Sequence, residues 1–248
     1  GARWAHARIN ERAGRALSTA RPKQPIDERD ALLIAYADHL RGHEAPLRTL
    51  QAFLDDQPGG AIEGVHVLPF HPSTSDGGFA VSDHTTVEPT LGTWADVRAL
   101  AASHRMMVDC VLNHVSASHP WFLGFLAGEA RYAEHFIVSD PDDDWEQVTR
   151  PRSSSLFTRF ARCGEPVEVW TTFSPDQVDL NYRSPAVLVD VVDMVLTAVE
   201  NGASLIRLDA IGYTWKSPGT ACLNLPEAHV IVSILRDVVD LVDPGVAL

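Results

Sequence analysis

Short apolar segments recur along this chain and alternate with segments whose apolar residues have helical spacing. Each short apolar segment is predicted to be a β-strand. The strands are expected at 32–38, 62–70, 106–114 and 204–210, and a fifth begins at 246–248. Strands that are apolar on both faces and alternate with helices predict a parallel sheet of βαβ units, and hence the α/β class.

Capping residues mark the ends of the predicted helices, in addition to their apolar spacing. Helices are expected over 46–56, 93–104, 185–201 and 226–242. Thr93 and Asp96 have the form of a capping box. Ser184 before Pro185 is typical of a helix start and Gly202 of a helix end, so both boundaries of the third helix are marked.

The alternation of strands and helices divides the chain into four parts. Residues 1–30 are rich in Arg and Ala and are expected to form an N-terminal arm, a surface helix followed by a linker. Residues 31–114 and 185–248 contain the strand and helix repeats. Residues 115–184 contain few clear helices and many Pro, Ser and Asp residues, which predicts a subdomain inserted after the third strand.

The composition excludes several classes of protein. Apolar residues make up 45% of the chain and charged residues 21%, which is typical of a globular domain and unlike a disordered one. The net charge of −13 argues against nucleic acid and anionic membrane surfaces as partners. No apolar run reaches the roughly 18 residues that a membrane span needs.

The number of cysteines and the N-terminal residues indicate the cellular compartment in which the protein is expected. Cys110, Cys163 and Cys222 are an odd number with wide spacing, which is typical of inert buried thiols in a reducing cytoplasm. The first residues lack the apolar core of a secretion signal, so a cytoplasmic location is expected. The chain does not begin with Met, and the oligomeric state stays open.

Polar side chains close two of the predicted strands. Asp109 and Asn113 face the same way on strand 106–114, and at the carboxyl end of a barrel strand they would line an active-site mouth. The alternative is a hydrogen-bonded strand end that holds a loop. Arg207 and Asp209 also share a face, and the guanidinium lowers the pKa of the carboxyl group. An ionised, oriented carboxylate suits a glycosidic nucleophile; the alternative is a structural ion pair.

Two loops add weaker candidates. Asp76 and Phe79 lie in a turn-rich segment and suit sugar recognition, although a plain turn is the alternative. Arg150-Pro-Arg152 has the chemistry to bind an anion such as phosphate, and a solvated surface pair is the alternative. His66 and His71 lack a third metal ligand within reach. Segment 170–177 has two interpretations, a core segment or a pocket wall, and the sequence alone does not choose between them.

Several of these segments resemble a known family. VDCVLNH, which contains Asp109, and SLIRLDAIG, which contains Asp209, resemble signature segments of the α-amylase superfamily of glycoside hydrolases. DGGFAVSDH, TRPR, VWTTFSPDQVDLNY and RLDAIGYTWKSPGTAC resemble the branch of sucrose, sucrose 6-phosphate, glucosylglycerol and glucosylglycerate phosphorylases. The resemblance covers roughly residues 27–248. It implies a TIM (β/α)8-barrel of which this chain holds the N-terminal part, about strands 1 to 5.

The resemblance also implies a role for each candidate side chain. Asp209 would be the nucleophile that forms a covalent glucosyl-enzyme, Arg207 would keep it ionised, and Arg152 would bind phosphate. Six side chains would contact the sugar or the acceptor: Asp76, Phe79, His114, Tyr213, Phe173 and Gln177. No metal is implied, and inorganic phosphate is a co-substrate in place of any cofactor.

The implied reaction is reversible phosphorolysis of a sucrose-like α-glucoside, which is a hexosyltransferase activity. The expected partners are a small sugar and phosphate, with no nucleic acid and no membrane. A retaining glycosidase needs two carboxylates, and the family's acid/base is a Glu at the end of strand five. Since the chain ends at Leu248, before any such Glu, we expect a fragment or truncated product with little turnover of its own.

Alternatives to this function remain at the level of the sequence. An α-glucoside hydrolase or transglucosidase would use the same barrel, with water or a sugar in place of phosphate. A non-catalytic, sugar-binding half-barrel is an alternative from another class. The acceptor is open among fructose, fructose 6-phosphate, glycerol and glycerate.

Overall fold

Four parallel strands form the central sheet of the computed structural model, which describes residues 2–16, 26–28, 30–57 and 62–248. The strands lie in the order β1 (Leu32–Ala35), β2 (Gly64–Val67), β3 (Arg105–Val111) and β8 (Leu205–Asp209). Ala247 forms a parallel bridge with Leu205 beside β8, as expected of a fifth strand that begins there. The predicted parallel sheet is therefore confirmed, with strands shorter than the apolar segments suggested.

The four predicted helices are present within one residue of their expected ends. They are α2 (Pro46–Asp55), α3 (Trp94–Ser103), α5 (Pro185–Glu200) and α6 (Pro226–Val242). The capping box of α3 forms, because Oδ2 of Asp96 accepts hydrogen bonds from the backbone N–H and the hydroxyl of Thr93. No helix of the described residues is long and apolar enough to cross a membrane.

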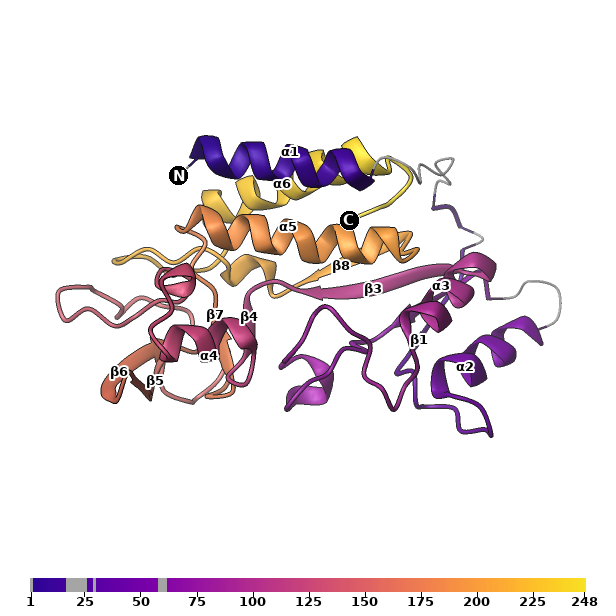
Figure 1. The fold of residues 1–248 in the computed structure, drawn as a ribbon, viewed down its shortest axis with the longest axis horizontal. Coiled ribbons are helices and arrows are strands. Elements are labelled where there is room, and N and C mark those ends of the chain that lie inside the picture. The colour runs from indigo at the N-terminus through magenta and orange to yellow at the C-terminus, as the bar shows by residue number, and fades with distance from the viewer. Residues whose placement is uncertain (1, 17–25, 29, 58–61) are drawn as a thin grey trace.

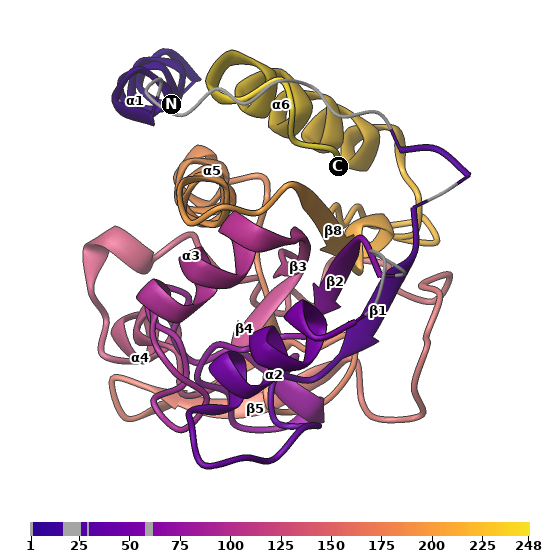
Figure 2. The same ribbon diagram turned by 90° about the vertical axis from the view of Figure 1, so that its right-hand side faces the viewer.

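The N-terminal helix α1 (Ala2–Ala16) packs onto the helical layer. α1 and α6 lie side by side over α5 (Figures 1 and 2). Ile9 and Ala13 are buried in this contact, and Arg12 forms ion pairs with Asp193 and Glu200. The expected surface helix is thus confirmed, while the expected linker falls largely on 17–25, outside the described residues.

The segment between β3 and α5 gathers at the carboxyl end of the sheet, on the left of Figure 1. It contains two short antiparallel pairs, which are β4 (His114–Ser116) with β7 (Gln177–Asp179) and β5 (Phe157–Arg162) with β6 (Glu165–Trp170). It also contains the α-helix α4 (Pro120–Leu126) and the 3₁₀ helix η3 (Ala130–Tyr132). The expectation that one strand runs through to His114 is wrong. β3 ends at Val111 and His114 begins a new strand, so Asn113 lies in a turn rather than beside Asp109 on one face.

The cysteines differ in part from expectation. Cys110 and Cys222 are buried, but Cys163 is exposed in the turn between β5 and β6, so the expectation of three buried thiols is wrong for Cys163. Burial raises the pKa of Cys110 to about 12. That thiol therefore stays protonated and unreactive at neutral pH.

Candidate active site

The carboxyl ends of β3 and β8 bring charged side chains into one network. Asp109 is in register with Arg207 on the neighbouring strand, and its side chain is fully buried. One oxygen of Asp109 accepts a hydrogen bond from Nη1 of Arg207, and the other lies 2.7 Å from Nε2 of His66. Nη2 of Arg207 lies 3.1 Å from Oδ1 of Asp209. Asp109 therefore anchors the guanidinium that contacts Asp209.

The ionisation of Asp209 departs from the simple expectation that Arg207 lowers its pKa. Burial raises the pKa of Asp209, and the charges of Arg207 and His114 oppose this shift without cancelling it. The expected net lowering is therefore wrong, because loss of hydration outweighs the attraction of a guanidinium that is itself 46% exposed. A carboxylate with little hydration suits a nucleophile, because few water molecules must leave its oxygens before they attack.

This balance predicts a pH dependence. If Asp209 acts as a carboxylate, activity is lost as the pH falls through its raised pKa, so the acidic limb of kcat/KM lies above the ordinary Asp value of 3.8. Arg207→Gln removes the charge that favours ionisation and is expected to move this limb to still higher pH. An acidic limb that stays in place in the variant would contradict the assignment.

Two backbone positions beside the site are strained. Ala210 follows Asp209 and has φ of 52°, and Asp76 has φ of 55°. Non-glycine residues in the left-handed region cost on the order of 1–3 kcal/mol and gather at functional sites. The turn at Ala210 leads directly into the 3₁₀ helix η4 (Ile211–Tyr213), and it thereby redirects the chain from the end of β8 towards Tyr213.

The side chains predicted to contact a sugar hydroxyl lie together. Gln177 Nε2 lies 2.9 Å from Oδ2 of Asp76 and 3.1 Å from Nε2 of His114. His114 Nε2 also lies 3.1 Å from the carbonyl oxygen of Phe79. Burial lowers the pKa of His114, although the charges of Asp179 and Asp209 oppose the shift. His114 is therefore neutral at pH 7 and offers one N–H as a hydrogen-bond donor.

Aromatic rings connect this group to the charged network. Phe173 contacts the ring of His114 at a centroid distance of 5.3 Å and that of Tyr213 at 5.4 Å. The guanidinium of Arg207 lies over Phe79, 5.9 Å from its ring centroid. The structure thus brings the six predicted sugar- or acceptor-binding side chains and the Arg207–Asp209 pair into one connected cluster, which we call the candidate site.

Arg152 is the exception among the predicted site residues. It is exposed in the segment before β5. Within the described part of the chain, no hydrogen bond, ion pair or ring contact joins it to the candidate site. The neighbouring Arg150 instead donates to the carbonyl oxygen of Ser154 at 2.5 Å and is half-buried. A phosphate-binding role for Arg152 stays a prediction.

Sequence reasoning missed a second polar cluster next to the candidate site. Asp179 and Lys216 form an ion pair with Nζ 2.7 Å from Oδ2, and both side chains are almost completely buried. Neither residue belongs to a sequence pattern that marks a functional side chain. Lys216 is, however, one of only two lysines in a chain rich in arginine. That rarity was the one available signal. Among the described residues, no group of three or more His, Cys, Asp or Glu is arranged to hold a metal ion.

Comparison with known proteins gives the family. Residues 60–240 match the family described as the catalytic domain of α-amylase. The glucosylglycerate phosphorylase of Allomeiothermus silvanus is 52% identical over 89% of this chain and 40% of its own length. The corresponding enzyme of Escherichia coli is 41% identical over 95% of this chain and 43% of its own length. The sucrose phosphorylase of Agrobacterium vitis is 36% identical over 83% of this chain and 44% of its own length.

Solved structures agree. The crystal structure of sucrose 6F-phosphate phosphorylase from Thermoanaerobacter thermosaccharolyticum superposes with a TM-score of 0.81 and 30% identity, over 90% of this chain and 48% of that one. Trehalulose synthase MutB from Pseudomonas mesoacidophila superposes at 0.75 with 23% identity, which shows the fold alone. The chain thus spans less than half the length of the relatives it matches and corresponds to the N-terminal half of their barrel. It belongs to the α-amylase catalytic domain family, among relatives that are glycoside phosphorylases.

Proposed function

We propose that the protein to which this chain belongs transfers a glucosyl unit from an α-glucoside to phosphate, with Asp209 as the nucleophile. The observation that supports this most is the Asp109–Arg207–Asp209 network, in which the buried carboxylate of Asp109 anchors a guanidinium that contacts the partly buried carboxylate of Asp209 at the end of β8. The phosphorylase relatives support the choice of reaction class. Phosphate is the co-substrate, and no cofactor is invoked.

The proposed chemistry has two displacements at the anomeric carbon. An oxygen of Asp209 forms a bond to C1 while the glycosidic C1–O bond breaks, and the leaving oxygen takes a proton from a second carboxylic acid. A phosphate oxygen then attacks C1, the C1–Asp209 bond breaks, and the second carboxylate takes back the phosphate proton. Two inversions give retention and release glucose 1-phosphate.

The second carboxyl group is proposed to come from outside these 248 residues. Asp109 is linked to Asp209 because Arg207 contacts both carboxylates. Both oxygens of Asp109, however, are already engaged, one by Arg207 and the other by His66. Neither oxygen of Asp109 is therefore free to reach the leaving group of a glucoside. We therefore expect the 248-residue polypeptide alone to show little turnover, since a general acid contributes about 10²- to 10⁴-fold.

For the substrate we propose glucosylglycerate, with glycerate as the second product. Relatives named as glucosylglycerate phosphorylases are 41–52% identical to this chain, whereas a relative named as a sucrose phosphorylase is 36% identical. Glycerate carries a carboxylate that fructose and glycerol lack, so an arginine such as Arg152 would suit the acceptor as well as phosphate.

The products of the full-length protein test this function. Incubation of glucosylglycerate with phosphate is expected to yield glucose 1-phosphate and glycerate in equal amounts. A protein that releases free glucose at the same rate without phosphate is a hydrolase. Sucrose and glucosylglycerol in place of glucosylglycerate should react at least tenfold more slowly, and the reverse order would contradict the proposed substrate.

A further inference from the structure

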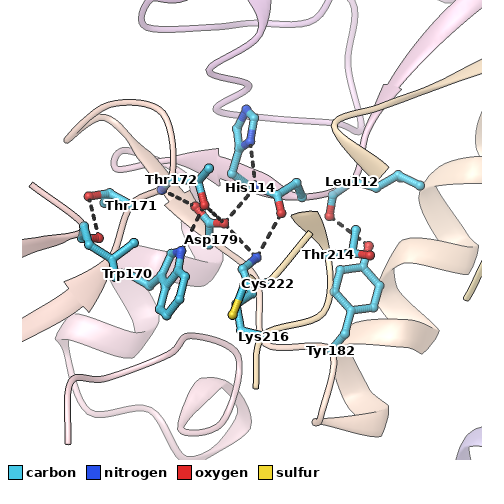
Figure 3. Close-up of polar contacts among 12 residues, drawn as sticks. Leu112, His114, Trp170, Thr171, Thr172, Asp179, Tyr182, Thr214, Lys216 and Cys222 are labelled. Atoms are coloured by element: carbon cyan, nitrogen blue, oxygen red, sulfur yellow. Dashed lines mark hydrogen bonds and ion pairs between the residues drawn. The ribbon is translucent and has the colours of Figure 1, made fainter. Parts of the chain in front are cut away.

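A buried polar cluster adjoins the candidate site (Figure 3). Its centre is the Asp179 carboxylate, one oxygen of which accepts from Thr172 N at 2.8 Å. The other oxygen accepts hydrogen bonds from Thr172 Oγ1 at 2.6 Å and Asn113 Nδ2 at 2.8 Å, and it forms an ion pair with Lys216 Nζ at 2.7 Å. Lys216 Nζ also donates to Asn113 Oδ1 at 2.9 Å. We call Asn113, Thr172, Asp179 and Lys216 the buried clamp.

The clamp is not explained by stability alone. Asp179 is fully buried and the Lys216 side chain is 2% exposed, so both charges lose most of their hydration. A buried ion pair often stabilises a fold no more than apolar residues of similar volume would. Loss of hydration lowers the pKa of Lys216 although Asp179 opposes the shift. An apolar contact would therefore serve packing as well, and the pair needs another reason.

The position of the clamp in the chain supplies that reason. Asn113 directly precedes His114, and Thr172 directly precedes Phe173. Asp179 lies on β7, two residues after Gln177, and Lys216 lies three residues after Tyr213. Each member of the clamp is thus joined by at most three residues of backbone to a different side chain of the candidate site.

The clamp also joins segments that share no sheet hydrogen bonds. β4 and β7 pair with each other, whereas η4 and the segment after it belong to no strand. Lys216 bonds this segment to both partners, to Asn113 before β4 and to Asp179 on β7. Contacts from one buried ammonium to two different segments fix the distance between these segments more sharply than apolar packing does.

We propose that Asp179 and Lys216 are a positioning pair that sets the place of Tyr213 relative to His114, Phe173 and Gln177 in the candidate site. The pair touches neither sugar nor phosphate. It acts through the four side chains that it spaces. This inference rests on the proposed function for its catalytic consequence, but not for its effect on sugar binding.

The test uses the double variant Asp179→Asn with Lys216→Met in the full-length protein. Removal of both charges together avoids an unpaired buried ion, which would destabilise the fold by itself. The variant is expected to fold with a cooperative thermal transition. Its kcat/KM for the α-glucoside should fall by about 10²-fold, as for misplacement of a substrate by about 1 Å. KM should rise more than kcat falls, because the Arg207–Asp209 contact is untouched.

The double variant Asp30→Asn with Arg105→Met, which also removes both charges of a pair, is the matched control. Arg105 begins β3 at the opposite end of the sheet and forms an ion pair with Asp30 at 2.7 Å, with both side chains less than 15% exposed. Loss of this pair should lower the thermal midpoint without a change in kcat/KM. If the variant Asp179→Asn with Lys216→Met has the kcat/KM of the wild-type protein, the positioning role is overturned.

A second readout separates this inference from the proposed function. Glucose affinity of the 248-residue polypeptide, measured by NMR titration, needs no turnover and should weaken at least tenfold in the variant Asp179→Asn with Lys216→Met. Unchanged affinity would refute the positioning role. If the wild-type protein forms no glucose 1-phosphate but the affinity still falls, the proposed function fails and the positioning pair stands.

Discussion

Replacing Asp209 with Asn in the full-length protein is expected to reduce formation of glucose 1-phosphate by on the order of 10⁴- to 10⁶-fold, as for other nucleophiles of covalent catalysis. The amide keeps the shape of the side chain but cannot form the glucosyl ester. Substrate affinity should change little, because the six side chains proposed to bind the sugar and the acceptor are untouched. The rate is measured by coupling glucose 1-phosphate release to a dehydrogenase.

The same variant distinguishes a nucleophile from a structural ion pair. Because burial raises the pKa of folded Asp209, its contribution to stability is present below the unfolded pKa and is lost as the pH rises through the folded pKa. At pH 7, Asp209→Asn should therefore leave the thermal midpoint unchanged or raise it. Asp240→Asn, which breaks an exposed pair with Arg236 on α6, is the control and should alter neither rate nor midpoint. If Asp209→Asn lowers the thermal midpoint but still forms glucose 1-phosphate, Asp209 belongs to a structural ion pair and is not the nucleophile.

Replacing Asp109 with Asn is expected to lower both the stability and the activity of the protein. Asp109 accepts from both His66 and Arg207, so the variant keeps the volume but loses the charge that anchors the guanidinium. Because Arg207 is half-exposed and can regain water, we expect a loss of about 1–3 kcal/mol in the free energy of unfolding. With Arg207 misplaced, kcat/KM should fall by about 10²-fold.

A surface pair of the same chemistry serves as the control for Asp109. Asp55 lies 2.8 Å from Nε2 of His104, and its side chain is 51% exposed. Asp55→Asn should change the free energy of unfolding by less than about 0.5 kcal/mol and leave activity intact. Chemical denaturation of both variants, with kinetics on the folded protein, gives the comparison. Equal effects of the two substitutions would contradict an anchoring role for Asp109.

Much of the fold was predictable because its signals are local. The apolar strands and the capped helices specify a parallel α/β sheet without any long-range information. The Arg207–Asp209 pair was predictable for the same reason, since residues two apart on a strand share a face. The family resemblance then added the wider set of proposed sugar-binding side chains, which lie up to 137 positions apart in the chain, from Asp76 to Tyr213.

The failures at the candidate site involve long-range structure. The turn after Val111 could not be predicted, because the polar residues that follow are held by β7 rather than by the strand itself. The net pKa shift of Asp209 depends on burial that only the folded chain provides. The role of Lys216 could not be predicted from its neighbours in sequence, because its ion-pair partner, Asp179, lies 37 positions earlier in the chain.

The most direct test is to identify the residue that becomes glucosylated. A fluorinated glucosyl fluoride, which forms the glucosyl-enzyme faster than it is turned over, is incubated with the full-length protein. The protein is then digested and its peptides are sequenced by mass spectrometry. We predict a single label on the side chain of Asp209, released when phosphate is added. A label on another carboxylate, or an unlabelled protein that inverts the anomeric configuration of its product, would contradict the proposed role of Asp209.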